Sequence, residues 1–494
     1  MNALHLLVIV PMLAGIFSFF LKTERLRQYL LIFSGMIHLI LSLYLAVSTP
    51  ACVSTSWIGL DALGKIFLLT VTVLFAFLTV YIFFTSEGNP DLEDEKRIRY
   101  RFVREPGKVF YGCLNFFLAS MSMAVISRHY GLQWIGIETT TLASTPLIYL
   151  KRSKHSLEAA WKYLVICSVG ISLALLGIFF LAMAMPEDMH LFTNIAMVNL
   201  AGLLNQRWLQ IAFVFIVIGY GTKMGLAPMH TWLPDAHGEA PPVVSALLSG
   251  ALLNCAFLGI LRVFQVCLAA GIAAFAQELL LILGLFSMGI AALFILHQVD
   301  YKRMLAYSSV EHMGILAVAI GLGGKASAAA MLHCICHSMT KAGLFFVSGN
   351  IYRFYHTKRC DEVQNLKRML PFTGALWLAG FLAITGTPPF ATFLSEFVIL
   401  KSALETHSYV TATLYTVFLA FIFIGMLGIF LGMFSAPNSA GGDRRVVKTH
   451  REKLMTLLPS FVLFSMVFIL TFYAPETLKN LLNEAASTLG GRPL

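Results

Sequence analysis

Long apolar runs separated by short polar stretches divide the sequence into segments of similar size. A helix needs about 20 residues to cross the hydrocarbon core of a bilayer, so apolar runs of about 17 to 25 residues predict membrane-spanning helices. We predict about 14 such helices, near residues 3–21, 28–47, 62–85, 109–127, 131–150, 161–185, 208–227, 241–265, 276–296, 303–322, 326–350, 371–404, 409–434 and 454–474. The pattern predicts an all-α, polytopic membrane protein.

Prolines interrupt the seventh and twelfth of these helices. The seventh ends in a polar crossing that contains Pro228, His230, Pro234, Asp235 and His237. The twelfth is broken at Pro388 and Pro389. Non-helical backbone at membrane depth is tolerated only where it is buried in protein or lines a wet cavity. We therefore expect discontinuous helices 7 and 12 to lie on an ion path.

The two broken helices are five helices apart and run in opposite directions, a pattern typical of inverted repeats around a midplane ion site. Residues 1–108 would form three helices and a charged cytoplasmic loop. Residues 109–265 would form the first five-helix repeat, helices 4 to 8, and residues 276–434 the inverted second, helices 9 to 13. Residues 435–494 would add a cytoplasmic loop, helix 14 and an outer tail.

Composition and charge agree with a membrane protein and orient it. The 494 residues are 58% hydrophobic and 12% charged, against about 25% charged in soluble domains. Of the 35 Lys and Arg, 24 lie in loops after odd-numbered helices, which the positive-inside rule places in the cytoplasm. Both termini would then face the outer, periplasmic side of a bacterial cytoplasmic (inner) membrane. The net charge of +10 is explained by these loops, so no nucleic-acid partner is expected.

Several ionisable residues fall inside predicted spans, where they are costly and usually functional. The first half has Glu138 and Lys223, which we expect to pair, so that protonation of Glu138 would promote proton release from Lys223. The second half has His312, His333, His337, Lys341 and Glu396. Histidine titrates near neutral pH, which suits a proton relay. The alternative is a set of hydrogen-bonded polar groups that only fix helix packing.

Other charged residues and the cysteines suggest no further site. Lys65, Lys162 and Arg262 lie near helix ends, so we expect their charges to reach the interface. The eight cysteines show no CxxC spacing, which argues against an iron–sulfur or zinc-ribbon site. In the sequence HCICH, His333 and His337 share one helical face, but Cys334 and Cys336 point elsewhere. At most two ligands converge there, so we predict neither a metal site nor catalytic residues on this chain.

Four sequence motifs together resemble a known family. KMGLAPMHTWLPDAHGEAP, AYSSVEHMG, HSMTKAGLFF and GTPPFATFLSEF resemble the antiporter-like membrane subunits of respiratory complex I, Mrp antiporters and membrane-bound hydrogenases. The resemblance covers almost the whole chain. It is strongest to hydrogenase-4 component F of formate hydrogenlyase-type complexes, followed by the proton-pumping chain 4 or M of NADH–quinone oxidoreductase.

The resemblance implies a fourteen-helix subunit that contributes one proton channel to a larger complex. The redox chemistry would occur in a peripheral arm and other membrane subunits, with nickel–iron, iron–sulfur or quinone cofactors there and none on this chain. By motif, Glu138 and Lys223 match the helix 5 glutamate and helix 7 lysine, while His312, His337 and Glu396 match polar positions of helices 10 to 12.

The chain departs from the family pattern at Asn254, where relatives usually have a lysine. Asparagine can hold a water chain but cannot itself carry a proton. We expect a modified relay that still works. A stand-alone Na⁺/H⁺ antiporter and a non-conducting membrane scaffold are the alternatives.

Overall fold

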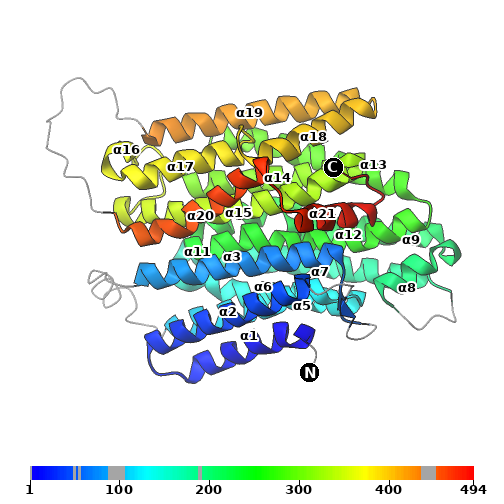
Figure 1. Cartoon of the computed structure of the whole chain (residues 1–494), viewed down its shortest axis with the longest axis horizontal. Coiled ribbons are helices and arrows are strands. Elements are labelled where there is room, and N and C mark those ends of the chain that lie inside the picture. Colours follow the sequence, from blue (N-terminus) through cyan, green and yellow to red (C-terminus); the bar gives the residue numbers. More distant parts are fainter. Residues whose placement is uncertain are drawn as a thin grey trace. The chain divides into compact units, whose positions relative to one another are not determined.

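The computed structural model describes residues 3–47, 52–53, 57–86, 106–186, 192–434 and 452–493 (Figure 1). Within these ranges, twelve helices are long and apolar enough to cross a membrane. Each of the predicted spans corresponds to a helix or to a broken helix, which confirms the predicted all-α membrane class. The loops 87–105 and 435–451, both expected to be cytoplasmic, lie outside the described residues.

The first part of the chain contains the following elements: α1 (Ala3–Phe20), α2 (Glu24–Val47), β1 (Cys52–Val53), β2 (Gly59–Leu60), α3 (Ala62–Ser86), α5 (Pro106–Ile126), α6 (Tyr130–Ile148), η1 (Tyr149–Lys151), α7 (Lys154–Met183), α8 (Asn194–Asn199), η2 (Ala201–Leu203), α9 (Gln206–Met224), η3 (Met229–Thr231), α10 (Trp232–Glu239), α11 (Pro242–Leu247), the π-helical turn η4 (Leu248–Leu252) and α12 (Leu253–Ala269). The two short strands pair antiparallel, Cys52 with Leu60.

The second part contains α13 (Ala273–Ile295), α14 (Tyr301–Leu322), α15 (Lys325–Tyr355), α16 (Leu366–Met369), α17 (Pro371–Ile384), α18 (Ala391–Glu405), α19 (Tyr409–Phe434), α20 (Leu454–Phe472) and α21 (Glu476–Ser487).

The chain forms two compact units. Unit 1 comprises Met1–Met224 and Glu239–Ala276, and unit 2 comprises Gly225–Gly238 and Gln277–Leu494. The polar crossing after helix 7 therefore packs with the second half of the chain, whereas the sequence-based division keeps it in the first repeat. The inverted repeats themselves stay a prediction.

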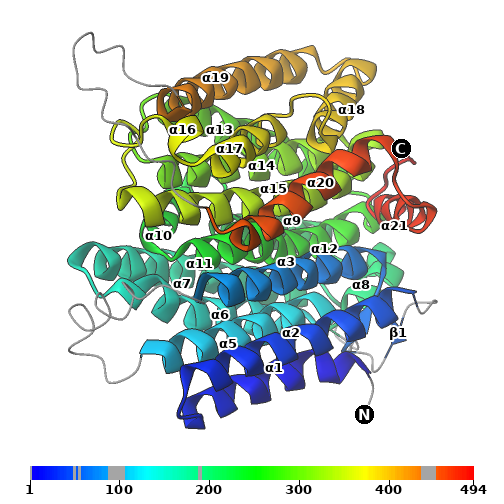
Figure 2. The same ribbon diagram turned by 60° about the vertical axis from the view of Figure 1, so that its left-hand side comes forward.

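In unit 1, small residues bring α7 and α9 into close contact. A Cβ atom on Gly219 of α9 would collide with the backbone of Ala174 in α7, and one on Gly170 would meet Thr222 at 2.6 Å. Small residues at such interfaces let helix backbones approach closely. Since Lys223 follows Gly219 by one turn, this contact fixes where its side chain leaves the helix. Figures 1 and 2 show α1, α2, α3 and α5 side by side in the same unit.

In unit 2, α15 is the central helix. Every residue from Ala326 to Gly349 is buried, and α14, α17, α18, α20 and α21 pack around it. A helix that is buried on all sides can carry polar groups away from lipid. His333, His337 and Lys341 of this helix are consequently inside the protein.

Helix 7 breaks earlier than expected. Helix α9 ends at Met224, Gly225 has a φ of +87°, and the backbone N–H of Ala227 is satisfied by Ser287 Oγ at 2.9 Å. The crossing then becomes helical again as α10. Pro234 does not break it, because the third residue of a helix has no intrahelical N–H bond to lose.

Helix 12 breaks where expected, over Thr385–Phe390, between α17 and α18. Gly386 has a φ of +57°, and the bond between Pro388 and Pro389 is cis. The Thr392 hydroxyl donates to the carbonyl of Ala383, which the break leaves without its helical partner. Side-chain hydroxyls thus satisfy the freed backbone at both breaks.

Candidate functional site

Lys223 occupies a fully buried position in unit 1. Its Nζ donates to Thr141 Oγ1 at 2.5 Å and to the Tyr163 hydroxyl at 2.9 Å. Tyr163 is also hydrogen-bonded to Ser144 at 2.7 Å. Hydroxyl groups from α6 and α7 therefore replace water around the ammonium group.

Glu138 reaches this lysine through one intervening hydroxyl. Its Oε2 accepts from Thr141 Oγ1 at 3.4 Å, and its Oε1 accepts from Ser168 Oγ at 3.2 Å. The sequence predicts a direct ion pair between Glu138 and Lys223, but in the described part of the chain the two form none. Thr141 instead donates to the carboxylate and accepts from the ammonium, so the two charged groups belong to one hydrogen-bonded path.

Asn254 lies just after the π-helical turn η4 in the helix that follows. Its side chain is buried, and Nδ2 donates to the carbonyl of Gly250 at 2.8 Å. Single π-helical turns inside α-helices occur often at functional sites. One amide donor of Asn254 is thus used by its own helix.

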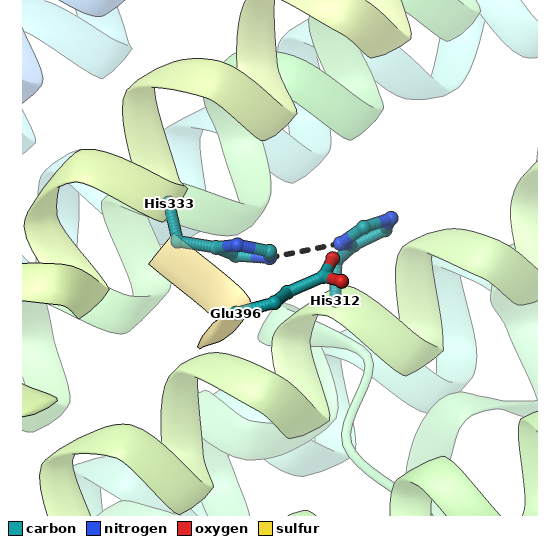
Figure 3. A group of neighbouring side chains, drawn as sticks. All are labelled: His312, His333 and Glu396. Atoms are coloured by element: carbon teal, nitrogen blue, oxygen red, sulfur yellow. Dashed lines mark hydrogen bonds between the residues drawn. The ribbon is translucent and has the colours of Figure 1, made fainter. Parts of the chain in front are cut away.

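In unit 2, three neighbouring helices bring their titratable residues together. His312 Nδ1 and His333 Nε2 are 2.8 Å apart, and the Glu396 carboxylate lies beside them (Figure 3). The ring of His337 is 4.7 Å from that of His312, centroid to centroid. Helices α14, α15 and α18 thus supply four predicted site residues to one buried cluster.

The hydrogen bonds around Ser395 indicate where the protons lie in this cluster. Ser395 Oγ donates its only hydrogen to the Thr392 carbonyl at 2.7 Å, so it accepts from His333 Nδ1, 2.9 Å away. Neutral His333 then has a lone pair on Nε2, and His312 Nδ1 is the donor between the two rings. The hydrogen between the two rings therefore belongs to His312.

Lys341 extends the polar path along α15, two turns from His333. Its Nζ donates to the Leu305 carbonyl at 2.5 Å and to the Ser308 hydroxyl. Glu311 is its acidic neighbour, and both side chains are buried. His337 lies on the same helix between Lys341 and the histidine pair.

The residues of the helix 7 crossing also contact this unit. Asp235 forms an ion pair with Arg303 at 3.1 Å, and His237 stacks on Phe345 with ring centroids 5.1 Å apart. His230 lies edge-on to Tyr307 at 6.1 Å. The crossing therefore packs against the first turns of α14, near Lys302, and against α15 one turn beyond Lys341.

The break in helix 12 holds Glu396 in place. A Cβ atom on Gly386 would overlap the Glu396 carboxylate, so only glycine leaves room for it there. Glu396 is 7% exposed, and its Oε1 has no hydrogen-bond partner among the described residues. The break and Pro388–Pro389 thus shape the pocket for this carboxylate.

The NADH:quinone oxidoreductase/Mrp antiporter transmembrane family matches residues 127–435, which include all of these groups. The chain belongs to this family. It is similar to a hydrogenase-4 component F homolog of Methylacidiphilum infernorum, with 37% identity over 84% of this chain and 87% of the relative. It is also similar to an NAD(P)H-quinone oxidoreductase chain 4 of Prochlorococcus marinus, with 33% identity over 53% of this chain and 49% of that one.

Several solved structures share the fold of this chain. A subunit of an archaeal membrane-bound sulfane sulfur reductase aligns with a TM-score of 0.84 at 19% identity, covering 98% of this chain and 97% of that one. A chain of the Mrp complex from a Dietzia species aligns at 0.82 and 17% identity, covering 99% and 96%. A chain of respiratory complex I from Thermus thermophilus aligns at 0.76 and 20%, covering 98% and 100%.

One expectation for this antiporter-like chain was wrong. Lys65 and Arg262 do not reach the interface, because both side chains are buried. Arg262 forms a two-point ion pair with Asp61. Burial would raise the pKa of the Asp61 carboxyl, but the guanidinium of Arg262 lowers it further, to about 2. Arg262 fixes helix packing in unit 1.

Sequence reasoning also missed the hydroxyl groups of the path. Thr141, Tyr163 and Ser168 in unit 1, and Ser308 and Ser395 in unit 2, connect the charged groups. The run TTTLAST after Glu138 was the one visible signal, since Thr141 lies one turn along the same helix face.

Proposed function

We propose that this chain is the proton-conducting membrane subunit of a redox-driven complex of the hydrogenase-4 type. The observation that carries the proposal is the buried sequence of titratable groups in unit 2, from Lys341 through His337 and His312 to His333 and Glu396. Buried ionisable groups are costly, so a row of them inside a membrane protein supports proton transfer. The names of the similar proteins, a hydrogenase-4 component and a quinone oxidoreductase chain, support the redox complex.

In unit 1, Glu138 would act as the control group. While it is ionised, it attracts the Thr141 hydrogen, and Thr141 Oγ1 stabilises the Lys223 ammonium. Protonation of Glu138 removes that attraction, and desolvation then favours release of the Lys223 proton. Asn254 would contribute by holding water, since its amide cannot titrate.

In unit 2, the histidine pair would act as the transfer step. A proton that reaches the second nitrogen of His312 makes its Nδ1–H more acidic, and this hydrogen can pass to His333 Nε2. His333 can then release its Nδ1 hydrogen toward Ser395, and Glu396 stabilises the extra positive charge from beside the pair. Proline break, glycine and carboxylate together would form the end of the path.

The chain would assemble with other membrane subunits and a peripheral redox arm. Nickel–iron, iron–sulfur or quinone chemistry would take place in those partners. Its place would be the bacterial cytoplasmic membrane, with both termini on the periplasmic side, as the basic loops indicate.

Two other functions each have one supporting observation. The likeness of fold to the Mrp complex favours a stand-alone Na⁺/H⁺ antiporter. The amide of Asn254, bonded to its own helix, favours a scaffold that conducts nothing.

Isolation of the native complex through a tag on this chain tests the proposed setting. We expect partner subunits to co-purify in mild detergent, with iron in the preparation and nickel where a hydrogenase arm is attached. Flavin without nickel would instead indicate a complex-I-like dehydrogenase. Recovery of the chain alone, still able to exchange Na⁺ for H⁺ in vesicles, would contradict the redox complex and support the antiporter.

A further inference from the structure

The cluster in Figure 3 has the composition of a transition-metal site. One nitrogen each of His312 and His333 and one oxygen of Glu396 all lie within 4.8 Å of one another. The three residues come from α14, α15 and α18, and both histidines are fully buried. Two imidazoles and one carboxylate, with a fourth position left for water, form a donor set that proteins use for zinc.

The hydrogen bonds around these residues resemble those around metal ligands. His333 donates its Nδ1 hydrogen to Ser395. Its Nε2 atom therefore carries a free lone pair, which faces His312. Ligating histidines commonly have the other ring nitrogen fixed by such a hydrogen bond. Glu396 adds a carboxylate oxygen that lacks a hydrogen-bond partner among the described residues, although it is more than nine-tenths buried.

The two histidine nitrogens need little adjustment, whereas the carboxylate oxygen of Glu396, within 4.8 Å of them, must move closer. Two nitrogens bound to one tetrahedral zinc at about 2.0–2.1 Å are about 3.3 Å apart. His312 Nδ1 and His333 Nε2 are 2.8 Å apart, so small side-chain rotations suffice. His312 must also move its hydrogen from Nδ1 to Nε2, which has no hydrogen-bond partner among the described residues.

We propose that His312, His333 and Glu396 bind a zinc-class divalent cation, and that the bound ion blocks the proton path of unit 2. The ion takes the same two nitrogens between which the proton would move. The blocking part rests on the proposed function, whereas the binding part rests on the geometry alone. Hard cations such as Mg²⁺ prefer all-oxygen sites and will not compete.

This site differs from the one that the sequence HCICH suggests. His337 shares a face of α15 with His333, yet the ligands that converge on His333 come from the neighbouring helices. Cys334 and Cys336 contribute nothing to the set. The two sites can be separated by the type of donor atom.

Zinc binding is measured on the full chain in lipid nanodiscs, by equilibration with ZnCl₂, gel filtration and metal analysis. We expect one zinc per chain, lost in His333→Gln and in Glu396→Gln. His407→Gln is the matched control, since His407 is exposed and bonds only Tyr409. Zinc that is retained in both cluster variants, or never retained by the unmodified chain, would overturn the site.

X-ray absorption of the zinc-loaded, unmodified chain identifies the atoms bound to zinc. It does not depend on whether a variant folds. We expect a shell of nitrogen and oxygen with imidazole scattering from two histidines. A sulfur shell would place the ion at Cys334 or Cys336 and overturn the assignment. An excess of Mg²⁺ should leave the zinc in place, and displacement by Mg²⁺ would contradict the donor set.

Proton transport by the assembled complex, measured with and without zinc, separates this proposal from the function itself. We expect zinc to inhibit transport by the unmodified complex at the concentrations at which it binds. Zinc that binds to the three residues without changing transport would overturn the blocking role and count against the proton path. Transport that is normal in a chain that binds no zinc would overturn the metal site alone.

Discussion

At the scale of single residues, neutral hydroxyl groups connect the charged ones. Thr141 lies between Glu138 and Lys223, and Ser395 fixes the tautomer of His333. A hydroxyl can donate one hydrogen bond while it accepts another, so it can bridge two charged groups. Without these hydroxyls, Glu138 and Lys223 would not be joined by hydrogen bonds.

Thr141→Val tests this link. The substitution keeps the size of the side chain and removes the hydroxyl, so Lys223 loses one of its two hydrogen bonds. Hydrogen bonds to charged groups contribute about 1.5–3 kcal/mol, so we expect redox-driven proton transport to fall roughly tenfold. Thr139→Val is the matched control, because the Thr139 hydroxyl bonds the backbone of its own helix at Ile135. Equal rates for both variants would remove Thr141 from the path.

The ion pair of Asp61 with Arg262 predicts a pH dependence of stability. The folded-state pKa of Asp61, about 2, lies below the ordinary aspartate pKa of 3.8. The pair therefore stabilises the fold fully above pH about 4, and this contribution is lost as the pH falls through 2. We expect the unfolding free-energy difference between the unmodified chain and Asp61→Asn to shrink by about 2 kcal/mol from pH 5 to pH 2. A difference that stays constant would show that the pair contributes nothing.

At the scale of helices, the breaks position the groups that the path needs. Glu396 faces the histidines because α18 begins at Ala391, just after the break. Gly386 in the break has no side chain, which leaves space for the Glu396 carboxylate. Lys223 points toward α6 and α7 because small residues bring α7 and α9 together. The irregular backbone is thus part of the site.

Gly386→Ala tests the role of the helix 12 break. A residue with a Cβ is strained at a φ of +57° by about 1–2 kcal/mol, and here the Cβ would also displace the Glu396 carboxylate. We expect a less stable chain with reduced proton transport. Gly428→Ala in α19, where a Cβ meets open space, should change neither property. Normal transport in Gly386→Ala would show that the position of Glu396 is not critical.

The sequence predicted the membrane spans and one of the two proline breaks, but not the contacts between distant residues. Hydropathy located the spans because every membrane helix must be apolar over a fixed length. Pro388–Pro389 marked a real break, whereas Pro234 did not, because a proline in the first turn of a helix leaves it intact. Arg262 was misplaced because its partner Asp61 is 201 residues away in the sequence. The sequence identified His312, His333 and Glu396 as relay residues but could not show that they meet, because they are far apart along the chain.

At the scale of the whole molecule, each compact unit contains its own set of titratable groups around a broken helix. Unit 1 has Glu138 and Lys223, and unit 2 has the histidines, Lys341 and Glu396. The crossing from Gly225 to Gly238 belongs to unit 2 although α9 belongs to unit 1. The helix break at Gly225 is therefore also the point at which the chain passes from unit 1 to unit 2.

The central claim is that protons pass through this chain, and the most direct measurement is redox-driven proton transport by the assembled complex in proteoliposomes. Lys223→Met and Glu396→Gln each remove one buried relay group, and we expect roughly tenfold or greater losses. Lys162→Met and Glu405→Gln are matched controls, because these side chains are exposed in surface ion pairs on α7 and α18. The account predicts losses in the first two variants only. Normal transport in Lys223→Met and Glu396→Gln, with the chain present in the complex, would contradict it and leave the chain a scaffold.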